Sequence, residues 1–129
     1  MSSEVPSTIA CLYVGSAFIA TDEARAVEGY KQAIVEGTSD DIVYSSLFTG
    51  VHGNYLKPSI RNAGLDPDRL PDGDPSKMDF GGGDSAKKAW KDIWGCGQGI
   101  AAVREVLPAG RLVERLAAEY HGARQRLAA

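Results

Sequence analysis

Gly15 and Ser16 are the residues of this 129-residue chain whose types and spacing most clearly suggest a binding site. They follow the apolar run Leu-Tyr-Val at residues 12–14, which is typical of a strand covered on both faces. A glycine lets the backbone approach a ligand because no Cβ holds the ligand away, and the neighbouring serine hydroxyl can donate to a phosphate oxygen. By itself, this pattern is more often a plain turn than a phosphate-binding turn.

Two histidines and a glycine-rich segment are the other candidates for chemistry. His52 lies in a polar stretch between two glycines, where a loop would present it, and a histidine can act as a base near neutral pH. His121 falls on the solvent side of a predicted C-terminal helix. The segment GCGQG at residues 95–99 is close to a dinucleotide-binding glycine motif, but that motif needs a strand before it. An amphipathic helix is expected there instead, which favours a tight connection between helices.

Composition excludes several classes of protein. A net charge of -3 with 24% charged residues argues against a basic nucleic-acid surface. No apolar stretch reaches the roughly 20 residues of a membrane span, and the N-terminus lacks the basic start of a signal peptide, so we expect a cytoplasmic protein. Cys11 and Cys96 have neither metal-site spacing nor a disulfide framework. We expect Cys11 in the core and Cys96 as a reduced structural thiol.

The N-terminal half is expected to be mainly helical. Thr21 is a good N-cap for a helix over residues 22–36, which Gly37 would end. Its buried stripe is expected at positions 24, 27, 31 and 34, with Tyr30 at the side. Residues 42–44 favour a strand or an extended segment, and residues 47–56 indicate a loop.

The C-terminal half alternates short helices with glycine-rich connections. Pro58 fits the start of a helix over residues 59–63 that Gly64 ends, and residues 65–85 predict a long mobile surface loop. Further helices are expected at residues 86–94, 100–106 and 109–127. The last helix carries an apolar face and a charged, solvated face. The apolar face consists of Leu112, Leu116, Tyr120, Ala123 and Leu127. The aromatic residues Tyr30, Phe48, Trp90 and Trp94 are expected to pack in the core.

Several long motifs occur together from about residue 10 to the end of the chain. They are GSAFIATDEARA, YKQAIV, DDIVYSSLFTGVHGNYLKPSI, AGLDPDRLP and AWKDIWGCGQGI. In this order they resemble the C-terminal portion of the nitronate monooxygenase family, the FMN-dependent TIM-barrel flavoproteins also called 2-nitropropane dioxygenases. The resemblance implies that Gly15 and Ser16 hold the FMN phosphate after the last barrel strand. It also places Gln98, which matches a Gly-Gln pair of the family, where it could face the flavin.

The resemblance implies an oxidoreductase that oxidises alkyl nitronates with O2, with no nucleic-acid or membrane partner. The family's catalytic histidine lies in a motif upstream of the last strand, and His52 does not match that motif. We therefore assign no catalytic residue and keep His52 as a pocket candidate. A complete barrel needs about 250 residues, so these residues cannot close one. The expected fold class is α/β: the last strand of a TIM barrel plus a mostly helical extension.

The resemblance leaves two interpretations open. Residues 1–9 would be a polar, poorly ordered segment outside the family, and residues 10–129 would be the family-like region. That region is either the truncated C-terminal portion of the enzyme, or a catalytically silent fragment or partner that completes a barrel in another chain. In both cases we expect the isolated chain to be colourless and to consume no O2 with a nitronate. The oligomeric state is open.

Overall fold

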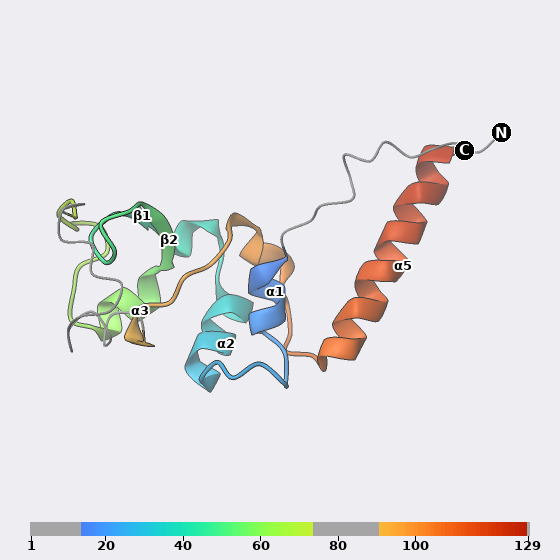
Figure 1. Cartoon of the computed structure of the whole chain (residues 1–129), viewed down its shortest axis with the longest axis horizontal. Helices are drawn as coiled ribbons and strands as arrows, with labels where there is room; N and C mark the ends of the chain where they lie inside the picture. Colours follow the sequence, from blue (N-terminus) through green and yellow to red (C-terminus); the bar gives the residue numbers. More distant parts are fainter. Residues whose placement is uncertain (1–13, 74–90, 129) are drawn as a thin grey trace.

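The computed structural model describes residues 14–73 and 91–128 (Figure 1). The elements in chain order are α1 (Gly15–Ile19), α2 (Glu28–Glu36), η2 (Ser39–Asp41), β1 (Ile42–Ser45), β2 (Gly53–Leu56), α3 (Lys57–Asn62), η4 (Gln98–Ala102) and α5 (Ala109–Ala128). About half of these described residues are helical, and their one sheet is the antiparallel pair β1–β2. They therefore form a small mixed α/β fold without a closed barrel. The predicted features at residues 1–13, including Cys11, and at Trp90 lie outside the described residues.

The segment around Gly15 and Ser16 differs from the predicted strand and turn. Val14 is described and belongs to no strand, while Gly15 begins the short helix α1. Thr21 does not cap a following helix: its hydroxyl donates to the carbonyl oxygen of Phe18 at 2.7 Å, and its residue is buried. The predicted N-cap is therefore wrong, because Thr21 instead pairs with Leu107 in a parallel bridge.

Helix α2 begins at Glu28, six residues later than predicted. The backbone N–H of Asp22 donates to the carbonyl oxygen of Leu107 at 2.9 Å, and the N–H of Ala24 donates to Thr21 in a turn, so this stretch is not helical. Lys31 and Ile34 are buried as expected, whereas Val27 is exposed. Gly37 ends the helix as predicted, at φ -74°.

The strand prediction at residues 42–44 is confirmed by β1, but the predicted loop at residues 47–56 is wrong at its end. Residues 53–56 form β2, with Ile42 opposite Leu56 and Ser45 opposite Gly53. The other edge of β2 forms hydrogen bonds with residues 94–96. The N–H of Leu56 donates to the carbonyl oxygen of Trp94, and the N–H of Cys96 donates to the carbonyl oxygen of Asn54. A segment 40 residues away in the chain thus helps to form this strand.

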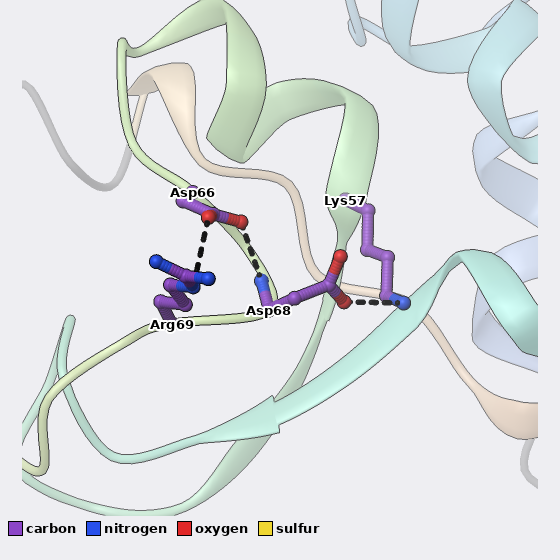
Figure 2. A network of polar contacts seen from close by, with 4 residues as sticks. All are labelled: Lys57, Asp66, Asp68 and Arg69. Carbon is purple, nitrogen blue, oxygen red and sulfur yellow. Dashed lines mark hydrogen bonds and ion pairs between the residues drawn. The ribbon is translucent and has the colours of Figure 1, made fainter.

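Helix α3 follows β2 directly and has the predicted proline in its first turn and Gly64 after its end, at φ 82°. Residues 65–73 have no helix or strand, as expected, but ion pairs hold their first part (Figure 2). Lys57 Nζ lies 3.0 Å from Asp68 Oδ1, and Asp66 accepts the Asp68 N–H at 3.0 Å. Arg69 Nε lies 3.9 Å from Asp66 Oδ2. These contacts tie the loop back to α3.

The core combines distant parts of the chain. Its buried members are Ala20, Ile34, Leu56, Ile100 and Val103. Tyr30 and Trp94 pack against this core as predicted, with their rings stacked at 5.2 Å. Phe48 packs edge-on against Tyr55 and is not among the residues of the core. Of the predicted helix at 86–94, residues 91 and 92 are helical, Ile93 is buried but not helical, and Trp94 is not helical, while residues 86–90 lie outside the described residues.

The C-terminal part ends in the long helix α5, which confirms the prediction for residues 109–127. The predicted helix at 100–106 is wrong, because a 3-10 helix covers residues 98–102 and the chain then extends to pair with residues 20–22. In Figure 1, α5 runs away from the body of the molecule, and of its apolar face only Leu112 is buried. Tyr120 and Leu127 remain 45% and 74% exposed. No helix in the described ranges is long and apolar enough to cross a membrane.

Candidate phosphate-binding site

Gly15 and Ser16 line a cavity of about 320 Å³ between the start of α1, the connection before η4, and α5. The lining residues with polar groups or exposed backbone are Gly15, Ser16, Gly97, Gly99, Arg115 and Glu119. The sequence predicted the first two as a pair. The structure adds two glycines from the GCGQG segment and a charged pair from α5.

Ser16 is the residue that joins the two sides of this cavity. Its Oγ accepts the backbone N–H of Gly97 at 2.7 Å, across 81 positions of sequence. A hydroxyl that accepts one hydrogen bond still has its own proton to donate. No described residue accepts that proton, so Ser16 can offer it to a ligand oxygen.

The glycines of the cavity are not explained by crowding. A Cβ placed on Gly15 or on Gly99 would meet no atom within 4 Å, and neither residue has a positive φ. Neither packing nor backbone strain therefore requires glycine at these two positions in the described part of the chain. Open space in front of a bare backbone is the arrangement that lets a ligand approach closely.

Arg115 was not identified from the sequence, where it appeared as part of the solvated face of the last helix. Its Nε is buried without a hydrogen-bond partner, the one such side-chain nitrogen or oxygen among the residues described. It forms an ion pair with Glu119 Oε1 at 3.6 Å, on a side chain that is 64% exposed. Buried polar groups normally have a hydrogen-bond partner, so a guanidinium nitrogen with only this long ion pair is unusual.

The other predicted site residues lie outside this cavity. His52 is exposed and stacks on Tyr44 at 4.7 Å, in the β1–β2 hairpin. Gln98 lies between the two lining glycines, but its side chain is directed to Asn54, with Nε2 3.5 Å from Oδ1. His121 is exposed beside Tyr120, as predicted. The structure therefore does not bring His52 or Gln98 together with Ser16 at one cavity.

The described residues offer little redox or metal chemistry of their own. Within them, no group of three or more His, Cys, Asp or Glu side chains could hold a metal ion. Cys96 has a free thiol that is half buried, and burial raises its pKa to about 11, so it is protonated at neutral pH. This agrees with the structural role predicted for Cys96.

A second, larger cavity of about 700 Å³ lies beside α3 and includes the side chains of Phe48, Asn62, Lys91 and Trp94. None of the predicted site residues lines it. Its walls are mainly apolar, and Lys91 is the one cation among the described residues that line it. None of these lining residues has a buried side-chain nitrogen or oxygen without a hydrogen-bond partner. The Ser16 cavity is therefore the better candidate for a binding site.

The arrangement around Ser16 can bind an anion with oxygen acceptors: it has a free hydroxyl proton, accessible backbone and a guanidinium. Comparison with known proteins finds no family model, no curated protein and no solved structure that matches this chain. The assignment of a function therefore depends on the sequence resemblance and on the geometry of this cavity.

Proposed function

We propose that this chain is the C-terminal portion of an FMN-dependent flavoprotein similar to the nitronate monooxygenases, in which Gly15 and Ser16 hold the FMN phosphate. The observation that supports it best is that Ser16 meets Gly97 at an open cavity, with a free hydroxyl proton and with Gly15 and Gly99 uncrowded. These are the properties expected of a phosphate cradle built from backbone and hydroxyl groups.

FMN would supply the electron transfer that oxidises an alkyl nitronate with O2. The residues of this chain would bind and orient it: the Ser16 hydroxyl donates to a phosphate oxygen, and the bare backbone at Gly15 allows the phosphate to come close. Among the described residues that line the cavity, Ser16 and Gly15 are the ones that would hold the phosphate, so we propose a binding role for this part of the site.

The size of the expected affinity decides which assay is useful. Three hydrogen bonds to a charged phosphate, at about 1.5 kcal/mol each, correspond to a dissociation constant of roughly a millimolar or slightly below. Such binding produces neither a yellow purified protein nor turnover, which agrees with the expectation from the sequence. An NMR titration of the labelled chain can detect it.

The test compares FMN with riboflavin, which lacks the phosphate. We expect shifts at residues of the cavity with FMN and none with riboflavin. Replacing Ser16 with alanine should weaken FMN binding about tenfold, which corresponds to about 1.4 kcal/mol. Gly15→Val should abolish it, because the branched side chain would fill the approach.

Gly110 provides the matched control for the valine substitution. It also has open space at its Cβ but does not line the cavity, so Gly110→Val should bind FMN like the parent. Equal shifts with riboflavin and FMN, or full binding by Gly15→Val, would show that Gly15 and Ser16 do not hold the phosphate.

The exposed apolar face of α5 favours a second candidate function. Val113, Tyr120 and Leu127 are all at least 45% exposed, although they lie on a long regular helix. A catalytically silent chain that completes a barrel in another protein would present such a face. For that function, the titration would show no phosphate-dependent shift while circular dichroism still reports a folded α5.

A further inference from the structure

Arg115 is the feature of this molecule that the proposed function does not yet use. It lines the Ser16 cavity, and its Nε is buried without a hydrogen bond. Arginine recognises phosphate with its planar set of N–H donors, and it stays charged at any physiological pH. The Nε itself is out of reach of solvent, but 35% of the side chain is exposed, so a ligand with oxygen acceptors in the cavity would contact the exposed part of Arg115.

We infer that Arg115 is a phosphate-binding residue of this cavity, and that Glu119 stands in for the phosphate when no ligand is bound. The inference deepens the proposed function, since it concerns the same cavity, and it names the ligand class as a phosphate monoester or free phosphate. Ser16 and Arg115 would then approach the phosphate from α1 and from α5, on two sides of the cavity.

Glu119 is a weak competitor for Arg115. The Arg115 Nε–Glu119 Oε1 distance of 3.6 Å is longer than a hydrogen bond to a charged group, and both side chains reach solvent. Exposed pairs of this kind contribute little to stability. A phosphate carries more charge than a carboxylate and three acceptor oxygens, so it can displace the glutamate.

Charged residues lie on both sides of Arg115. Arg115 and Glu119 are the charged residues that line the Ser16 cavity. A neighbouring cavity of about 340 Å³ brings Glu105, Arg111 and Glu114 near the other side of Arg115. Of these carboxylates, Glu114 is already paired with Arg111 at 3.0 Å, and the described structure has no ion pair between Glu105 and Arg115.

The inference is tested by titrating inorganic phosphate, FMN and riboflavin into the full chain at fixed ionic strength. Arg115→Gln should weaken phosphate and FMN binding at least tenfold. Glu119→Gln should strengthen both several-fold, since it removes the competitor. Circular dichroism shows whether Arg115→Gln disturbs α5. If it does, the tighter binding expected of Glu119→Gln still tests the inference.

Arg111→Gln and Glu114→Gln are the matched controls. They make the same changes of charge one helical turn away, outside the Ser16 cavity, and should leave both affinities unchanged. If Arg111→Gln weakens phosphate binding as much as Arg115→Gln does, the effect is one of net charge and the inference is overturned.

The three ligands separate the inference from the proposed function. Arg115-dependent binding of phosphate with no binding of FMN would support the inference and contradict the flavin function. If FMN binds through its phosphate but Arg115→Gln binds it as tightly as the parent, the flavin function is supported and the inference about Arg115 is contradicted. If inorganic phosphate produces no shift at millimolar concentrations in the parent and in Glu119→Gln, Arg115 is not a phosphate-binding residue.

Discussion

Replacing Gly37 with alanine should destabilise the protein, although its backbone conformation is one that alanine adopts readily. Gly37 has φ -74° at the end of α2. At such a position alanine usually stabilises a protein by about 0.4–1 kcal/mol, because it reduces the conformational entropy of the unfolded chain. Here a Cβ would lie 2.6 Å from the carbonyl oxygen of Ala33 and 2.9 Å from Ile100 Cδ1. Both distances are too short, so the backbone or the core must shift.

The magnitude follows from these two opposed effects. Forcing an extra carbon into a packed core costs about 1–3 kcal/mol, and Ile100 is fully buried, so it has no free space to move into. Subtracting the chain-entropy gain leaves a net loss of about 1–2 kcal/mol. With a urea m-value of roughly 1–2 kcal/mol/M, the unfolding midpoint should fall by about 1 M. Tryptophan fluorescence can follow the transition, because Trp94 packs against this core.

Two variants test this reasoning. Gly110→Ala, at a helical position with open space, should raise the free energy of unfolding by about 0.5–1 kcal/mol. The double variant Gly37→Ala/Ile100→Val lacks the Cδ1 atom, so it should lose less stability than the sum of its two single changes. If Gly37→Ala is as stable as the parent, the packing described at the end of α2 is wrong.

Three further predictions concern single side chains. Ser59→Ala should lower the free energy of unfolding by about 1–2 kcal/mol in urea titrations, because the hydroxyl donates to one backbone group at 2.7 Å and accepts from another at 3.0 Å; unchanged stability would contradict this. The N–H of Ala109 donates to Glu23 at 2.7 Å and lowers the pKa of that carboxyl below its ordinary 4.5. The stabilisation is therefore present above pH 4.5 and lost as pH falls through the lower folded value, so Glu23→Gln should be less stable than the parent at pH 7 and equal to it in acid. If the free energies of unfolding of Glu23→Gln and the parent differ by the same amount at both pH values, this explanation is refuted. In a Cys11→Ser background, the thiol of Cys96, with its pKa of about 11, should react with a thiol reagent at pH 8 far more slowly than in urea, and equal rates would show that it is not buried.

The sequence predicted the elements whose signals are local. Helix α3 has a proline in its first turn and Gly64 after its end, and α5 has an uninterrupted helical apolar period. Each signal acts within a few residues, so it can be recognised without knowledge of the rest of the chain. The helical register of Lys31 and Ile34 was also correct, and both are buried.

The errors occurred where distant segments decide the local structure. Thr21 has the residue type of an N-cap, yet its backbone pairs with Leu107. Residues 53–56 look like a loop, but β1 on one side and residues 94–96 on the other make them a strand. Propensity cannot identify such partners, because the hydrogen bonds that decide the outcome come from other segments, 8 to 87 positions away.

The candidate site was predictable in part. Gly15 and Ser16 do line a cavity, whereas His52 lies in a different part of the fold. Arg115 could not be selected from the sequence, since α5 carries several arginines with the same local surroundings. The structure distinguishes it, because its Nε is buried without a hydrogen-bond partner among the described residues.

The hydrogen bonds between residues 16–23 and residues 97–109 have a consequence for the order of folding during synthesis. Ala20 and Thr21 are buried, and their backbone groups pair with Leu107, so α1 leaves the ribosome well before the segment that stabilises it. Until then its apolar side chains stay exposed to other nascent chains and to chaperones. A chain that ended before Val103 would lack part of the core around Ile34, and so would lose the packing of α2 as well as that of α1.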